Sequence, residues 1–105
     1  MKRALQGLLI AGERMKNDVL SGVKKITIRE GYRDYTKGPV LIGCHILNWV
    51  TMKNIIRVER TKLSDINIED IEKDGFIDHI HALGVLKKFY PNMTLNSDVT
   101  VIEWE

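Results

Sequence analysis

Short segments rich in β-branched and aliphatic residues recur along the whole chain, and glycine, proline or asparagine residues separate them. Five of these segments have the length and composition of strands: Leu8–Ala11, Lys25–Arg29, Val40–Leu47, Ile55–Thr61 and Val99–Trp104. The second alternates polar and apolar residues, which is typical of a half-buried strand with one face toward a core. So many short strands confine the chain to a fold organised around a small sheet.

Three further segments have the features of helices. Glu13–Leu20 ends close to Gly22, and Asn67 is placed to cap a short helix over Ile68–Lys73. Phe76–Phe89 is amphipathic, with four apolar side chains on one face: Phe76, Ile80, Leu83 and Leu86. Strands mixed with two or three helices predict a small α+β fold of about five or six strands, mostly antiparallel, as an open sheet or a barrel.

Length and composition exclude several classes of protein. A chain of 105 residues forms one domain, here residues 1–105, and 44% hydrophobic with 29% charged residues argues against intrinsic disorder. No apolar run approaches the ~20 residues of a membrane-spanning helix, and the basic start lacks a cleavage site typical of a signal peptide. The single cysteine, Cys44, excludes an internal disulfide and a cysteine-based zinc site. We therefore expect a cytoplasmic protein, with a monomer as the default.

Charge is distributed unevenly along the chain. Residues 1–62 hold thirteen basic and five acidic residues, whereas residues 63–105 hold three and nine, and the net charge is +2. The first half can therefore form a basic surface that attracts a phosphate-bearing ligand. Alternatively, the two halves attract one another across the fold.

The polar cluster Lys24–Gly31 is the first candidate for chemistry. A desolvated lysine can accept the proton of a weak nucleophile such as the Thr27 hydroxyl. Strict alternation puts Lys25 on the face of Thr27, so Lys24 joins it only from the turn before the strand or from a bulge. The competing interpretation is an ordinary solvated strand face with basic residues.

Other candidate residues carry weaker signals. The acidic run Glu69–Gly75 is typical of a solvated helix face, but a carboxyl beside Gly75 could act as a general acid or base in a cleft. His45, His79 and His81 do not have the spacing of metal ligands, and we expect no metal and no cofactor. Four aromatic residues could stack on a base or fill the core: Tyr32, Tyr35, Trp49 and Trp104.

The run from Gly22 to Arg29, Gly-Val-Lys-Lys-Ile-Thr-Ile-Arg, resembles the G-x-K-x-x-T-x-R signature of the ASCH domain, a member of the PUA-like superfamily. The preceding helix, the following Gly38-Pro39 strand and the later helix beginning at Asp74-Gly75-Phe76 fit the same pattern, so the resemblance covers nearly the whole chain. It implies a small β-barrel with flanking helices and a cleft lined by the signature residues. Proteins of this superfamily generally handle RNA or nucleosides.

The resemblance also implies an activity. Small bacterial ASCH proteins include amidohydrolases that remove the acetyl group from N(4)-acetylcytidine by means of a lysine, a threonine and a distal glutamate. Carried over, the threonine nucleophile falls on Thr27 and the lysine base on Lys24, in preference to Lys25. The distal acid falls near Asp74, with Glu72 as the second choice, and aspartate is one methylene shorter than the family residue.

Two hypotheses therefore stand side by side. The first is an amidohydrolase acting on an acylated cytidine-like nucleoside through Lys24, Thr27 and Asp74. The second is a module that binds single-stranded RNA or a modified nucleotide without turnover. The predicted ligand contacts are basic and aromatic residues: Lys25, Arg29, Tyr32, Arg33 and Tyr35. The binding hypothesis adds Lys24 as a basic contact and Trp49 as an alternative stacking residue.

Overall fold

The computed structural model describes residues 6–10, 13–44 and 49–105 and contains one five-stranded sheet. Its strands follow the order β1-β3-β4-β5-β2 and are β1 (Gln6–Leu9), β2 (Ile26–Glu30), β3 (Gly38–Cys44), β4 (Trp49–Lys62) and β5 (Asp98–Trp104). The helices are α1 (Glu13–Ser21), α2 (Ile68–Lys73) and α3 (His79–Leu86), with a 3₁₀ turn over Leu63–Asp65. The predicted α+β fold is confirmed.

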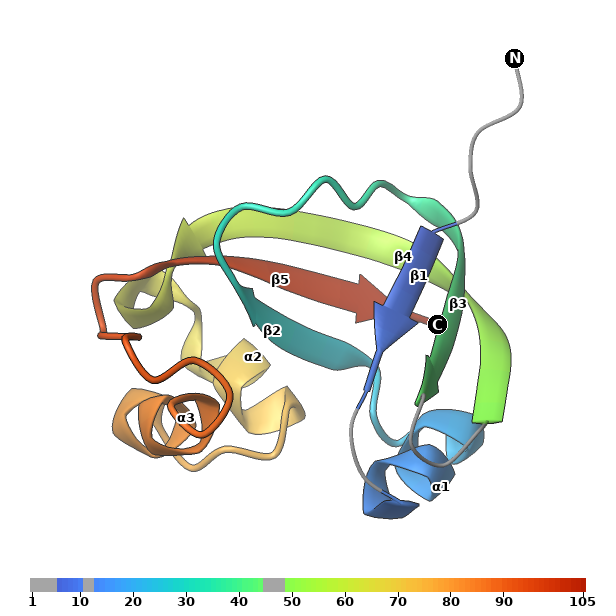
Figure 1. Cartoon of the computed structure of the whole chain (residues 1–105), viewed down its shortest axis with the longest axis horizontal. Helices are drawn as coiled ribbons and strands as arrows, with labels where there is room; N and C mark the ends of the chain where they lie inside the picture. The colour runs from blue at the N-terminus through green and yellow to red at the C-terminus, as the bar shows by residue number, and fades with distance from the viewer. Residues whose placement is uncertain (1–5, 11–12, 45–48) are drawn as a thin grey trace.

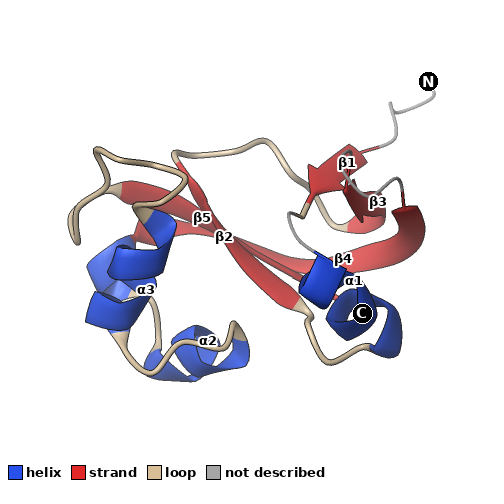
Figure 2. Cartoon of the chain, turned by 60° about the horizontal axis from the view of Figure 1, so that its bottom comes forward, coloured by secondary structure: helices blue, strands red, loops and turns tan. Residues whose placement is uncertain are grey.

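The sheet is mostly antiparallel and curls into half a barrel (Figure 1). β1 and β3 form its single parallel pair among the described strands. The long β4 runs along the whole sheet, and its register against β5 shifts between Ile55 and Arg57, where the strand bends. β1 and β2 are therefore the two edges of the sheet, and a hydrogen bond from Arg29 to the Leu9 carbonyl joins them. α2 and α3 lie near one end of the sheet and α1 near the other (Figure 2).

Two apolar clusters lie on opposite faces of this sheet. The first packs α2 and α3 against β2 and β5, with Ile26, Ile71 and Val101 in its centre. The second lies inside the curl, where Trp104 is 1% exposed and belongs to one cluster with residues of β1, β3 and β4 and with Val19 of α1. Three consecutive residues of β2, Ile26 to Ile28, are buried. The predicted alternation over Lys25–Arg29 holds for the exposed Lys25 and the half-buried Arg29 but is wrong for Thr27, which is buried on the polar face.

The observed elements differ from the expected ones at a few boundaries. α3 begins at His79 rather than Phe76, because the Asp78 carboxylate accepts from the backbone N–H of His81 at 2.8 Å and so caps the helix there. β4 begins at Trp49, six residues before the predicted start, since Val50 and its neighbours pair with β3. The prediction for Leu47 and His45 lies outside the described residues. Within the described chain no helix has the length and hydropathy of a membrane span.

Candidate functional site

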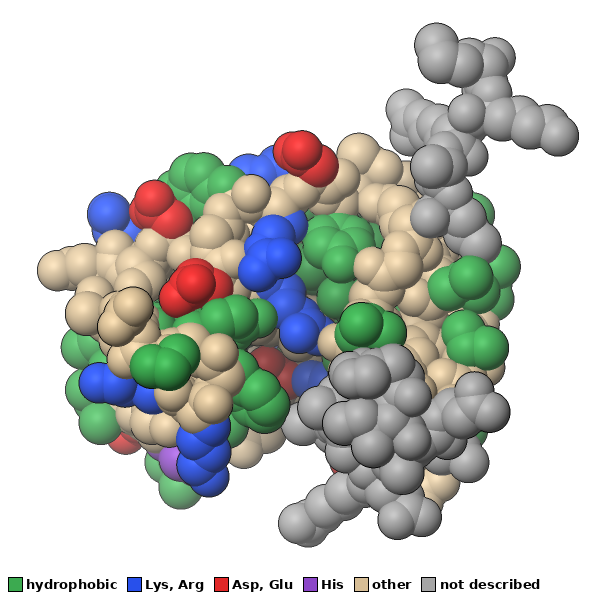
Figure 3. All heavy atoms as spheres, in the orientation of Figure 1, with side chains coloured by type: hydrophobic (Ala, Val, Ile, Leu, Met, Phe, Trp, Pro, Cys, Tyr) green, Lys and Arg blue, Asp and Glu red, His purple; other side chains and the backbone are tan. Residues whose placement is uncertain are grey.

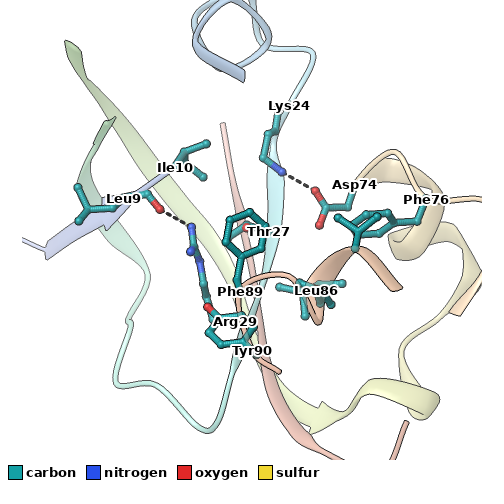
Figure 4. A pocket seen from close by; sticks show the side chains of 12 residues that line it. Leu9, Ile10, Lys24, Thr27, Arg29, Asp74, Phe76, Leu86, Phe89 and Tyr90 are labelled. Atoms are coloured by element: carbon teal, nitrogen blue, oxygen red, sulfur yellow. Dashed lines mark hydrogen bonds and ion pairs between the residues drawn. The ribbon is translucent and has the colours of Figure 1, made fainter. Parts of the chain in front are cut away.

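A pocket of about 200 Å³ opens beside the free edge of β2, between the end of β1 on one side and α2 and α3 on the other. Its polar lining comes from Lys24, Thr27, Arg29 and Asp74 (Figure 4). The space-filling view shows basic side chains leading into the hollow, with an acidic group at its base (Figure 3). The pocket thus joins the signature segment to the acidic run that follows it by some fifty residues.

Lys24 reaches the pocket from the turn that precedes β2. Gly22, at φ +83°, ends α1 in the left-handed conformation, and the Lys24 N–H then donates to the carbonyl of Asp18 at 2.8 Å. The side chain is only 11% exposed, and its Nζ donates to the Ile26 carbonyl at 2.6 Å and to the Asp74 carboxylate. Lys24 therefore lies beside β2 without belonging to the strand, which is the condition under which it can approach Thr27.

Asp74 is positioned by the way in which α2 ends. The N–H of Gly75 donates to the Glu72 carbonyl at 2.9 Å, and that of Phe76 donates to the Ile71 carbonyl at 3.0 Å. These two bonds form a Schellman motif, for which Gly75 supplies the required positive φ of 88°. Because Ile71 is fixed in the core, the motif holds the Asp74 side chain toward Lys24 and directs Phe76 into the pocket lining.

The electrostatics of the pocket bear most on Asp74. Burial raises the pKa of the Asp74 carboxyl above its ordinary value, and the positive charges of Lys24 and Arg29 oppose part of that rise. The Asp74 carboxylate is thus a stronger base than that of a solvated aspartate. A perturbed carboxyl in a pocket is typical of a functional site.

Thr27 and Arg29 follow Lys24 along β2. Thr27 is 7% exposed, lines the pocket, and its hydroxyl makes no hydrogen bond with any described residue. Arg29 donates from a terminal guanidinium nitrogen to the Leu9 carbonyl at 2.5 Å, so it ties the two edges of the sheet together. Its Nε, in contrast, is buried at the pocket and makes no hydrogen bond within the described chain. The site therefore offers a free hydroxyl and a free donor.

The remaining predicted ligand contacts lie outside the pocket. Lys25 and Tyr32 are exposed, and Tyr35 donates to the Gly7 carbonyl at 2.7 Å while packing on the inner cluster. Arg33 is exposed, and its Nε donates to the Glu30 carbonyl at 2.7 Å. Glu72, the second candidate acid, is also exposed and does not line the pocket. The structure thus brings together four of the proposed site residues and separates the others.

The apolar wall of the pocket was missed at the sequence level. Phe76, Phe89 and Tyr90 line it from the two ends of α3, and Leu9 lines it from β1. Phe89 is 60% exposed and lies at the rim of the pocket. The signal available in the sequence was the Phe89-Tyr90-Pro91 triplet, which by itself indicates only the end of a helix.

A network of charged side chains attaches α2 to the sheet just before Asp74. The Arg57 guanidinium donates to both carboxylate oxygens of Asp70, at 2.7 and 3.1 Å, and to Glu103 at 2.9 Å. These carboxylates raise the pKa of Arg57, although burial opposes them. Lys73 adds a second link to Glu103 at 3.2 Å. Among the described residues, no group of three histidine, cysteine or acidic side chains could hold a metal ion.

Comparisons with known proteins identify the fold and leave the activity open. No protein-family model matches the chain, and a search of curated proteins finds no relative. A crystal structure of a protein from Enterococcus faecalis, described under the family DUF984, matches with a TM-score of 0.73. The match covers 100% of this chain and 82% of that chain at 12% sequence identity, so the likeness concerns the fold alone.

Proposed function

We propose that the chain is an ASCH-type amidohydrolase that removes an acyl group, such as acetyl, from the exocyclic amine of a cytidine-like nucleoside. One observation carries this proposal: Lys24, Thr27 and Asp74 line the same small pocket, and Lys24 contacts Asp74 directly. These are the positions on which the resemblance of the signature segment places a base, a nucleophile and an acid.

The reaction begins with proton transfer within the charged pair. Asp74 accepts a proton from Lys24, and the resulting neutral amine takes the proton of the Thr27 hydroxyl as the oxygen attacks the acyl carbonyl. The C–N bond then breaks, and the protonated Asp74 gives its proton to the leaving exocyclic amine. The acyl group is now an ester of Thr27. A water molecule, deprotonated by the same pair, hydrolyses it to a carboxylic acid and restores the hydroxyl.

Arg29 is suited to stabilise the negative charge that develops on the acyl oxygen. Its guanidinium carries a positive charge, lines the pocket and is held in position by its bond to the Leu9 carbonyl. A preorganised charge of this kind acts strongly in a site that excludes water. Because the bond to β1 holds the guanidinium in place, little reorganisation is needed during the reaction.

The shorter acid is compatible with this scheme. An aspartate replaces the glutamate expected from the resemblance, and a displacement of about 1 Å at a reacting group can cost ~100-fold in rate. Here the Schellman motif holds the Asp74 carboxylate against Lys24. The backbone at the end of α2 therefore brings the shorter side chain to Lys24, and the additional methylene of a glutamate is not needed.

The test is direct. Purified protein is incubated with N(4)-acetylcytidine, and release of cytidine is followed by chromatography. We expect turnover by the wild type and a loss of at least about 100-fold in kcat for Thr27→Ala. Thr61→Ala, a threonine of β4 outside the pocket, is the matched control and should keep wild-type activity. A folded wild type without turnover, or a fully active Thr27→Ala variant, would refute the mechanism.

Binding of single-stranded RNA without turnover is the alternative function. It predicts an affinity that falls with salt concentration and with the loss of basic residues such as Lys25 and Arg33. Both side chains are exposed, as such contacts require. Salt-dependent binding of RNA by a protein that does not hydrolyse N(4)-acetylcytidine would favour this alternative.

A further inference from the structure

The free edge of β2 presents backbone hydrogen-bonding groups to the pocket. β2 pairs only with β5 among the described strands, and in an antiparallel pair alternate residues bond to the partner strand. The Trp104 N–H donates to the Lys25 carbonyl at 2.8 Å, and the Gly31 N–H donates to the Asp98 carbonyl at 2.7 Å. The odd-numbered residues of the strand therefore face β5. The peptide groups of Ile26, Ile28 and Glu30 point away from it.

Side chains occupy both ends of this free edge. The Ile26 carbonyl accepts from Lys24 Nζ at 2.6 Å, and the Glu30 carbonyl accepts from Arg33 Nε at 2.7 Å. No described residue donates to the carbonyl of Ile28 or accepts from its N–H. Ile28 is nevertheless only 3% exposed, and it lines the pocket.

An unpaired peptide group at such depth requires a partner. More than 90% of buried backbone groups in folded proteins are hydrogen-bonded, because an unpaired one carries the full cost of desolvation. The unpaired Nε of Arg29, the next residue, adds a second buried donor at the same place. The pocket therefore contains two donors and one acceptor that the described residues leave unpaired.

We propose that the Ile28 peptide group is the docking point for one hydrogen-bonding edge of the ligand, with the Ile28 N–H donating to an acceptor of the ligand and the Ile28 carbonyl accepting from a neighbouring donor. The inference deepens the proposed function, since it concerns the ligand of that same pocket. Arg29 Nε supplies the third contact, to a second acceptor.

The occupant is a small planar group rather than a peptide strand. An added strand needs a row of unpaired groups, but Lys24 and Arg33 already bond the carbonyls on either side of Ile28. The unpaired N–H and carbonyl of Ile28 accommodate a single amide-like unit. A pyrimidine has the matching chemistry, because cytosine presents the acceptors N3 and O2 and the donor N4–H on one edge. Acylation of N4 leaves one hydrogen on that nitrogen, so the acylated substrate retains the same donor and the same two acceptors as cytosine.

Guanine has the opposite composition, with two donors and one acceptor on its corresponding edge. It therefore places donors against the two donors of the pocket and leaves at least one group unpaired. The pocket should prefer pyrimidine nucleosides over guanosine for this reason. The backbone, which no side-chain substitution alters, carries much of that preference.

Amide hydrogen exchange of the ¹⁵N-labelled protein tests the docking directly, with cytidine as the probe. In the free protein the Ile28 N–H should exchange faster than those of Thr27 and Arg29, which bond to β5. Saturating cytidine should slow the exchange of Ile28 by at least about tenfold, as one added hydrogen bond implies. Guanosine at the same concentration should leave it unchanged. Cytidine that binds without slowing Ile28 exchange overturns the inference.

A variant pair provides the second measurement. Ile28→Pro removes the N–H that faces the free edge, a position at which sheets tolerate proline, together with a buried apolar side chain. Cytidine should then bind about tenfold more weakly, whereas Glu30→Pro, which removes the equivalent N–H outside the pocket, should bind normally. If Ile28→Pro does not fold, N(4),N(4)-dimethylcytidine replaces it, because this analogue lacks the ligand's donor and should bind the wild type about tenfold more weakly than cytidine. Undiminished binding in the variant or of the analogue overturns the inference.

The outcomes separate this inference from the proposed function. Cytidine that protects the Ile28 amide, together with no hydrolysis of N(4)-acetylcytidine, supports the docking site and refutes the amidohydrolase. Hydrolysis that proceeds with an unprotected Ile28 amide supports the amidohydrolase and refutes the docking site. A protein that neither binds cytidine nor hydrolyses the acetylated nucleoside refutes both.

Discussion

The Lys24 ammonium contacts the Asp74 carboxylate in a nearly closed environment, although 50 positions separate the two residues. Their side chains are 11% and 6% exposed. An ion pair at this depth gives little net stability, because each charge loses its hydration when it is buried. A buried carboxyl with a raised pKa, paired in this way and lining a pocket, is typical of a functional site.

The first prediction concerns the dependence of stability on pH. Since burial raises the pKa of Asp74 in the folded state, the folded protein binds a proton more tightly than the unfolded chain does. The free energy of unfolding should therefore fall as pH rises from the ordinary pKa of an aspartate through the raised value. Asp74→Asn should lack this fall, whereas Asp65→Asn, at an exposed aspartate, should retain it. Urea unfolding at a series of pH values measures the difference, and parallel curves for wild type and Asp74→Asn would contradict the assignment.

The second prediction separates two adjacent lysines. Lys24→Met removes the group that contacts Asp74, and it should lower kcat for N(4)-acetylcytidine by at least about 100-fold. Lys25→Met changes an exposed side chain outside the pocket, so kcat should stay within about twofold of the wild-type value. Steady-state kinetics of the two variants provide the comparison. Equal losses in both would mean that general positive charge matters, rather than one positioned base.

These two lysines also illustrate how far the sequence could be interpreted. The strands and helices are predictable because their periodicity and turn residues are local properties, and the five strands are all found. The position of the Lys24 side chain depends on a turn that begins at Gly22. Simple alternation along β2 would instead predict that Lys25 lies on the same face as Thr27. The resemblance to the ASCH signature selects Lys24, and the structure places that residue at the pocket.

Other parts of the site depend on tertiary contacts that no local pattern reports. Phe89 and Tyr90 follow α3, and nothing in their own segment indicates that the end of this helix lies against β1 and β2. Likewise, the unpaired peptide group of Ile28 exists only because β2 is an edge strand, which is a property of strand order. Tyr35, a predicted ligand contact, does not line the pocket, and its hydroxyl donates to the Gly7 carbonyl.

The third prediction compares two glycines at which an added Cβ atom would meet no other atom within 4 Å. Gly75→Ala forces a non-glycine residue into φ +88°, so it should destabilise the protein by about 1 kcal/mol and lower kcat by displacing Asp74. Gly84→Ala lies within α3 without a positive φ and should stabilise the protein by about 0.5–1 kcal/mol. Thermal unfolding and kinetics of both variants test the pair. A harmless Gly75→Ala would show that the Schellman motif does not position the acid.

The fourth prediction concerns the attachment of α2 to the sheet. Arg57→Ala leaves the Asp70 carboxylate, whose side chain is 8% exposed, without its bidentate partner, and should cost about 3 kcal/mol of stability. Lys62→Ala breaks a pair with Asp98 in which both side chains are about half exposed, and should cost less than about 0.5 kcal/mol. Chemical denaturation measures both values. Similar small losses in the two variants would mean that water compensates Asp70.

The last prediction concerns the aromatic rim of the pocket. Phe89 is 60% exposed and belongs to neither core cluster, so Phe89→Ala should leave the melting temperature nearly unchanged. A ring at the rim can stack on a base, an interaction worth about 1–3 kcal/mol. If the stacking is equal in the ground and transition states, KM for N(4)-acetylcytidine should rise by about tenfold while kcat is preserved. Phe89→Trp should retain a low KM, because its ring can stack as well. A Phe89→Ala variant with unchanged KM would place the base elsewhere in the pocket, and a loss confined to kcat would assign Phe89 to the transition state.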